Sequence, residues 1–131
     1  MIRIALDAMG SDDAPRVEVE GAVQALRELR PAFRIQLVGR TADIEAALQA
    51  RGDFDRGRLD VVEAPEVVGM GEKPLAAVKG KPRSSIAVGL GLQKQGESDA
   101  FISAGNTGAV MAAATLMLRV HEGVQRAAIG T

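Results

Sequence analysis

The strongest candidate for chemistry is the short stretch Ser103-Ala-Gly-Asn-Thr-Gly108, which lies between an apolar run and a long helix-forming run. Small residues allow backbone N–H groups to approach an anion, and the following helix would add unpaired N–H groups and the positive end of its dipole. The stretch therefore predicts a phosphate-sized cradle formed by Ser103, Gly105, Asn106, Thr107 and Gly108. The alternative is structural, with the glycines making a tight turn and Thr107 capping the helix.

A second candidate is the carboxylate of Asp7, which follows the first apolar run of the chain. Turn-forming residues come directly after it, among them Gly10, Asp12 and Pro15. Ligands of parallel sheets collect at the carboxyl ends of the strands, where Asp7 would orient a ligand. The alternative is that Asp7 accepts hydrogen bonds from the N–H groups of its own loop, as Asp often does in turns.

A third candidate is a basic segment that leads into two serines. Its residues are Lys73, Lys79, Lys81 and Arg83, followed by Ser84 and Ser85. Cations ahead of a helix N-terminus suit an acidic or phosphorylated partner. A solvated charged face is the alternative explanation.

The composition excludes several classes of protein. The chain has 131 residues, with 16 Lys and Arg against 17 Asp and Glu, and a formal net charge of −1. Proteins that bind nucleic acid or anionic membranes through charge need a positive surplus, so both partners are disfavoured. The aromatic residues are three Phe with no Trp or Tyr, which leaves no stacking platform for bases.

The composition also offers little to metals and cofactors. There is no Cys, and His121 is the single histidine, so neither a thiolate nor a His-rich metal site is expected. The glycines match neither the P-loop nor the dinucleotide-binding fingerprint. The first residues do not resemble a signal peptide, and no apolar run approaches the roughly 18–20 residues that span a bilayer, so we expect a cytoplasmic chain.

Strands and helices must alternate to position these residues. Short apolar runs predict strands, and apolar residues at spacings of three and four predict amphipathic helices. The expected order is a strand over 2–7, a helix from Arg16 that ends before Pro31, a strand over 33–39, a helix over 41–48 capped by Thr41 and a strand over 59–64. Such alternation predicts a parallel sheet with helices on both faces.

The second half is less regular. Residues 64–74 carry Gly and Pro at spacings that predict a loop. Residues 84–95 fit a strand or a helix, and helix is favoured because a clear strand follows over 99–103. The Ala/Met/Leu run that continues to Val120 predicts a long helix.

Together the three candidate stretches resemble the acyl-acyl carrier protein:phosphate acyltransferase family of bacterial phospholipid synthesis, known as PlsX. Asp7-Ala-Met-Gly-Ser-Asp-Asp-Ala-Pro15 resembles the opening motif of that family, Asp-Ala-Met-Gly-Gly-Asp. Glu72-Lys-Pro74 with Ala77-Val78-Lys79 and Ser84-Ser85 resembles the middle basic segment of the family. The stretch Ser103-Ala-Gly-Asn-Thr-Gly-Ala109, preceded by Asp99-Ala100, resembles its most distinctive motif. Ser11, Lys79, Pro82-Arg83 and Ala127 depart from the family pattern without removing a polar group of the motifs.

The resemblance implies a fold as well as an activity. The PlsX family is similar to the isocitrate and isopropylmalate dehydrogenases and to the phosphate acetyltransferases, which implies a three-layer α/β/α architecture with a mainly parallel sheet. Family members are more than twice as long, and Thr131 falls within what resembles another strand. Residues 1–131 are therefore expected to be the N-terminal portion of a single α/β acyltransferase domain, with the fold incomplete here.

The implied reaction moves a fatty acyl group from the thioester of acyl carrier protein to inorganic phosphate, giving acyl phosphate and free carrier thiol. Phosphate is the nucleophile, and a thiol with a pKa of about 8.5 leaves with little help from an acid. Positioning would supply most of the catalysis. The catalytic residues expected are Asn106, Ser103 and Lys73, the phosphate-binding residues are Ser103, Gly105, Asn106, Thr107 and Gly108, and those that bind substrate or carrier are Asp7, Gly10, Asp12, Lys79, Lys81, Ser84 and Ser85.

Two other functions stay open at this point. One is an enzyme similar to phosphate acetyltransferase that uses acyl-coenzyme A, and the other is a non-catalytic fragment that binds acyl carrier protein. The resemblance further implies no cofactor, a homodimer, and a peripheral place at the inner face of the membrane beside an acyltransferase that consumes acyl phosphate.

Overall fold

The computed structural model describes residues 1–128. The strand expected at the end of the chain therefore falls in part on residues 129–131, which lie outside the described residues. In chain order the elements are β1 (Ile2–Asp7), α1 (Arg16–Glu28), β2 (Phe33–Gly39), α2 (Thr41–Gln49), a short 3-10 turn (Arg56–Arg58), β3 (Leu59–Glu63), α3 (Pro74–Gly80), α4 (Ser85–Lys94), β4 (Ala100–Ile102) and α5 (Thr107–Met117). None of the helices described is long and apolar enough to cross a bilayer.

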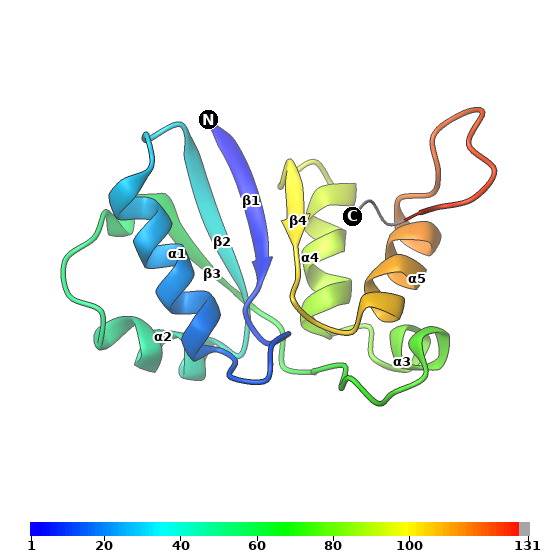
Figure 1. Cartoon of the computed structure of the whole chain (residues 1–131), viewed down its shortest axis with the longest axis horizontal. Coiled ribbons are helices and arrows are strands. Elements are labelled where there is room, and N and C mark those ends of the chain that lie inside the picture. The colour runs from blue at the N-terminus through cyan, green and yellow to red at the C-terminus, as the bar shows by residue number, and fades with distance from the viewer. Residues whose placement is uncertain (129–131) are drawn as a thin grey trace.

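The strands form one parallel sheet in the order β3-β2-β1-β4 (Figure 1). Ile4 of β1 pairs with Ile35 of β2 on one side and with Ala100 of β4 on the other. The predicted parallel α/β fold is confirmed. Because all strands run the same way, the loops that follow β1 and β4 leave the sheet at the same edge, side by side.

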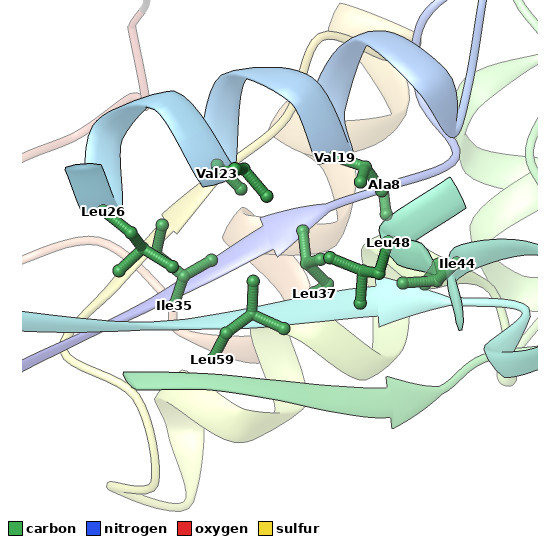
Figure 2. Packing of buried hydrophobic residues seen from close by; sticks show 10 residues of the cluster. Ala8, Val19, Val23, Leu26, Ile35, Leu37, Ile44, Leu48 and Leu59 are labelled. Atoms are coloured by element: carbon green, nitrogen blue, oxygen red, sulfur yellow. The ribbon is translucent and has the colours of Figure 1, made fainter. Parts of the chain in front are cut away.

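Helices α1 and α2 cover one face of the sheet. In Figure 2, Val19, Val23 and Leu26 of α1 point toward the side chains of Leu37 and other strand residues. Val19 and Leu37 have no exposed surface, and Val23 is 1% exposed. Residues spaced three and four apart lie on one helical face, which explains why the sequence pattern predicted α1.

Helix α4 covers the other face. Leu92 packs with Ala5 and Val38 of the sheet, and Ser84 caps the helix by accepting a hydrogen bond from the Ala87 N–H at 3.2 Å. The helix favoured for this segment is confirmed, although its apolar residues alternate. A Cβ on Gly89 would lie 2.3 Å from the ring of Phe101 in β4, so this glycine lets α4 approach β4 closely.

Four details differ from the expectations. The proposed Thr41 cap is wrong, because Arg40 is the N-cap and the Thr41 N–H instead donates to Glu63 at 2.9 Å. Helix α3 was not predicted; it begins at Pro74 directly after the loop. Strand β4 is shorter than the 99–103 expected. Helix α5 ends at Met117 rather than continuing to Val120, and Arg119 beyond it has a positive φ of 66°.

Candidate functional site

The loop after β1 and the loop after β4 meet at the carboxyl edge of the sheet. The Asp7 side chain, only 1% exposed, joins them: one oxygen accepts the Met9 N–H at 3.0 Å, and the other accepts the Ser103 hydroxyl at 2.7 Å. Ser103 Oγ in turn accepts the Gly105 N–H at 3.0 Å. The Ser103 proton is therefore directed to Asp7, and Asp7 bonds its own loop as the structural alternative describes.

The contact between these loops depends on Gly10. A Cβ at this position would lie 2.7 Å from the Gly105 nitrogen and 2.8 Å from an Asp7 oxygen, both closer than real Cβ atoms come. Gly105 is also crowded, since a Cβ there would lie 3.1 Å from Ser103 Oγ. The glycines of the two motifs thus allow one loop backbone to touch the other.

Asn106 joins the start of α5 to the loop between β3 and α3. Its Oδ1 accepts the Ala109 N–H at 3.1 Å, which makes Asn106 the N-cap of α5. Its Nδ2 lies 3.1 Å from the carbonyl oxygens of both Gly69 and Glu72. Asn106 is 7% exposed, so this side chain is committed to protein partners. The cap that sequence reasoning gave to Thr107 belongs to Asn106.

The first turn of α5 holds two N–H groups that form no hydrogen bond within residues 1–128. The N–H groups of Thr107 and Gly108 lie in this turn, where no helical carbonyl is available to accept them. Gly108 also sets the position of α3, because a Cβ on it would lie 2.6 Å from the Pro74 ring. Lys73 precedes Pro74 as the N-cap of α3 and is exposed. Lys73 therefore adjoins the proline that lies against Gly108, and no hydrogen bond within residues 1–128 uses the N–H groups of Thr107 and Gly108.

Lys81 braces the loop that Asn106 holds. Its Nζ donates to the carbonyl of Val67 and to the Glu72 carboxylate, each at 2.8 Å. The hydrogen bond from Lys81 lowers the pKa of Glu72, which also accepts the N–H of Gly69. Loop 67–72 is therefore tied to α5 and to Lys81 at the same time.

The other predicted residues lie apart from this cluster. Lys79 is exposed on α3, and Asp12 is exposed in the turn after β1; neither forms an ion pair with another residue of the described range 1–128. Ser84 and Ser85 are buried at 1% and 2% exposure, and Ser84 caps α4. The roles of these four residues in binding substrate or carrier stay predictions. Because Ser84 and Ser85 are buried, the structure does not support a contact of either serine with a carrier protein.

A cavity of about 350 Å³ opens beside the cluster. Ser103, Gly105 and Thr107 line one part of it, and apolar residues of α5 line much of the rest. No pattern in the loop motifs pointed to this cavity, but apolar residues of α5 spaced three and four apart could have indicated it. Within residues 1–128 no three acidic or histidine side chains are grouped so that they could hold a metal ion.

Comparison with known proteins gives consistent results. Residues 2–131 match the family model described as "Fatty acid synthesis protein". A protein of Salinibacter ruber named phosphate acyltransferase is 48% identical over 127 residues, which cover 97% of this chain and 38% of that protein. A protein of the same name from Akkermansia muciniphila is 45% identical over 130 residues, covering 99% of this chain and 37% of the relative.

The chain thus spans less than two fifths of the length of these relatives and corresponds to their N-terminal part. The resemblance to the PlsX family is confirmed. Since the family model matches almost every residue and the relatives are this similar along nearly the whole chain, this chain belongs to the family of fatty acid synthesis proteins.

Proposed function

We propose that this chain is the N-terminal portion of a single acyltransferase domain that moves a fatty acyl group from acyl carrier protein to inorganic phosphate. The family and the name phosphate acyltransferase borne by the relatives support this activity. The observation that carries the proposal is the start of α5, whose first-turn N–H groups lie beside a cavity at the carboxyl edge of the sheet.

In the proposed reaction a phosphate oxygen attacks the carbonyl carbon of the thioester. The tetrahedral intermediate then collapses, the carbon–sulfur bond breaks, and acyl phosphate and the carrier thiolate leave. The N–H groups of Thr107 and Gly108 would hold phosphate together with the positive end of the α5 dipole. Lys73 would add positive charge near the phosphate. Each hydrogen-bond donor aimed at the oxyanion of the tetrahedral intermediate lowers the activation free energy by about 3 kcal/mol.

The side chains around this cradle would act by positioning. The Ser103 hydroxyl donates a hydrogen bond to Asp7, and both polar atoms of the Asn106 side chain are hydrogen-bonded to backbone groups. We therefore assign Ser103 and Asn106 to holding the loop and the helix start in place, while backbone N–H groups contact phosphate. Gly10 and Gly105 would keep the two loops close enough to leave the cradle small.

The donor side of the proposal concerns acyl carrier protein, an acidic partner. Lys73 and Lys79 are exposed on and beside α3, next to the loop that Asn106 holds, and would face this partner. From the resemblance we add a homodimer, a cytoplasmic place at the inner face of the membrane, and delivery of acyl phosphate to a membrane acyltransferase.

The test is release of carrier thiol from palmitoyl-acyl carrier protein with and without inorganic phosphate. It compares this chain with a completed chain, in which the C-terminal segment of the Salinibacter ruber relative follows these residues. We expect phosphate-dependent release from the completed chain. If phosphate does not increase release by the completed chain, the proposed activity is wrong.

Two competing functions give different results in the same assay. An acyl-coenzyme A enzyme would turn over palmitoyl-coenzyme A in preference to the carrier-bound donor. A protein that only binds acyl carrier protein would retain the carrier on a column without phosphate-dependent release.

A further inference from the structure

Loop 67–72, between β3 and α3, holds the start of α5 through its own carbonyl groups. Asn106 Nδ2 donates to the carbonyls of Gly69 and Glu72, each at 3.1 Å. Asn106 is also the N-cap of α5, through the bond from the Ala109 N–H to its Oδ1. A shift of loop 67–72 would therefore shift the first turn of α5, whose N–H groups form the proposed phosphate cradle.

Apolar packing fixes this loop at a single point. Val68 is the buried residue of the loop, at 6% exposed, and belongs to the same apolar cluster as Ala109 of α5. The loop also contains Gly69 and Gly71, and a Cβ on Gly71 would have no neighbour within 4 Å. Because glycine leaves the backbone many conformations, the shape of the loop beyond Val68 depends on its polar contacts.

Lys81 joins the two ends of the loop. Its Nζ donates to the Val67 carbonyl and to Glu72 Oε2, each at 2.8 Å. The same carboxylate oxygen of Glu72 accepts the Gly69 N–H. One ammonium group thus links the first residue of loop 67–72 to the last, and since Lys81 is the C-cap of α3, the ion pair also spans this helix.

We infer that Glu72 and Lys81 are positioning residues for phosphate binding, and the inference rests on the proposed function. Their ion pair holds loop 67–72, the loop holds Asn106, and Asn106 fixes the N–H groups that would contact phosphate. Two of the three N–H groups of Lys81 are bonded in this way. Lys81 therefore acts through Asn106, in place of the contact with substrate or carrier predicted from the sequence.

The exposure of the ion pair separates this role from a purely structural one. The side chains of Lys81 and Glu72 are 34% and 37% exposed. Ion pairs as exposed as this one add little to global stability. Loss of the pair should consequently change phosphate binding more than it changes the free energy of unfolding.

The test is a double-mutant cycle between Lys81 and Asn106 in the completed chain. Lys81→Met removes the charge and keeps the bulk of the side chain. We expect it to raise the KM for phosphate about fivefold and to change the KM for palmitoyl-acyl carrier protein by less than about twofold. Added to Asn106→Ala, it should raise the KM for phosphate little further, because both substitutions release the same helix start.

Two results of this cycle would overturn the inference. Effects of Lys81→Met and Asn106→Ala that multiply would show that Lys81 acts independently of Asn106. A rise confined to the KM for palmitoyl-acyl carrier protein would assign Lys81 to carrier binding instead.

Arg56→Met is the matched control. Like Lys81, Arg56 donates to one carboxylate, that of Glu45, and to one carbonyl, that of Leu59. These contacts lie before and at the start of β3, at the opposite end of the strand from loop 67–72, so the KM for phosphate should not change. Lys81→Arg keeps a positive donor and should bring the KM for phosphate back to within about twofold of the wild type.

A further variant keeps the test decisive if Lys81→Met does not fold. Glu72→Gln removes the charge but keeps an acceptor for the Gly69 N–H, and it should raise the KM for phosphate as Lys81→Met does. If wild-type turnover depends on phosphate but neither variant differs from Arg56→Met, the positioning role is wrong while the function stands. If the wild-type completed chain shows no phosphate-dependent turnover, the proposed function is wrong, and the positioning role falls with it.

Discussion

Asp7 and Ser103 are 96 residues apart in the chain, yet their side chains share a hydrogen bond of 2.7 Å. Asp7 is buried and also holds the N–H of Met9, so its carboxylate fixes the end of β1 and the end of β4 together. Asn106 does the same for α5 and loop 67–72. At the scale of single residues, the motifs are held by hydrogen bonds between loops.

Replacing Asp7 should therefore destabilise the fold. Asp7→Ala leaves the Ser103 hydroxyl and the Met9 N–H without their acceptor, and we expect a loss of about 1–3 kcal/mol in the free energy of unfolding. Urea denaturation of the variant and the wild type measures this. Asp12→Ala, in the exposed turn of the same loop, is the control and should change stability by less than about 0.5 kcal/mol. Equal effects at the two positions would contradict the role of Asp7.

Replacing Asn106 should affect phosphate use as well as stability. Asn106→Ala removes the N-cap of α5, which costs about 1 kcal/mol, and frees the carbonyls of Gly69 and Glu72. In the completed chain we expect the KM for phosphate to rise sharply, because the first-turn donors lose their fixed position. Asn106→Asp keeps an acceptor for the Ala109 N–H but removes the amide N–H groups that donate to Gly69 and Glu72. This variant therefore separates the loss of the contact with loop 67–72 from the loss of the helix cap. Unchanged phosphate kinetics in both variants would contradict this assignment.

At the scale of elements, glycines decide how closely the helices pack. Gly89 and Gly91 both lie in α4, but their surroundings differ. A Cβ on Gly89 would lie 2.3 Å from the Phe101 ring, whereas one on Gly91 would have its nearest neighbour, the Met117 methyl group, at 3.8 Å. The same helix therefore contains one glycine required by packing and one that packing does not require.

Alanine at these two positions should have opposite effects. Gly91→Ala reduces the freedom of the unfolded chain and should stabilise the protein by about 0.5–1 kcal/mol. Gly89→Ala forces α4 away from Phe101 and should destabilise it by about 1–3 kcal/mol. Thermal denaturation of the two variants measures the difference. A stabilising Gly89→Ala would show that α4 does not pack on β4 as described.

The stabilisation of the β1–β4 pairing by Asp99 should be lost at low pH. Asp99, just before β4, accepts hydrogen bonds from the Arg3 backbone at 2.8 Å and from the Arg3 side chain at 3.0 and 3.1 Å. These bonds lower the pKa of Asp99 to about 2 from an ordinary value of 3.8. The lowered pKa means that the stabilisation is complete above about pH 4 and is lost as the pH falls toward about 2.

Asp99→Asn should therefore make the stability of the protein depend less on pH in the acid range. Between about pH 4 and about pH 2 the urea midpoint of the wild type should fall more steeply than that of the variant. Asp12→Asn controls for the loss of one carboxylate. Parallel curves for the wild type and Asp99→Asn would contradict a contribution from the Arg3 pair.

At the scale of the whole molecule, charge is balanced. The formal net charge is −1, so the chain has no net positive charge that would attract an acidic carrier protein. Any attraction must come from local cations, and Lys73 and Lys79 are exposed near the proposed site. Lys81, by contrast, is bonded to Glu72 and Val67.

Reversing a local charge should therefore weaken binding of the carrier in a salt-dependent way. In the completed chain, Lys79→Glu should raise the KM for palmitoyl-acyl carrier protein several-fold at low salt, and the difference should shrink at high salt because exposed charges are screened. Lys94→Glu, at the exposed end of α4, is the matched control. Equal effects of the two substitutions would contradict a carrier surface at α3.

Local patterns were sufficient to predict most of the fold. The spacing of Val19, Val23 and Leu26 predicted α1, and the apolar runs predicted the parallel strands, because burial on one face imposes a period on the sequence. Helix α3 was overlooked, although Pro74 at its first position is a signal of a helix start. The Thr41 cap was wrong because the nearby Glu63 carboxylate, on another element, takes the Thr41 N–H.

The sequence by itself determined the order of the strands and of the helices other than α3, the family, and the three motifs, since each depends on neighbouring residues or on similarity along the chain. Only the tertiary structure decided which motif residues share hydrogen bonds, as in the Asp7 and Ser103 pair and in the contacts of Asn106 with loop 67–72. It also decided that Ser84 is buried and that α5 borders a cavity. The hydrogen bonds depend on contacts between residues tens of positions apart, which no local pattern encodes.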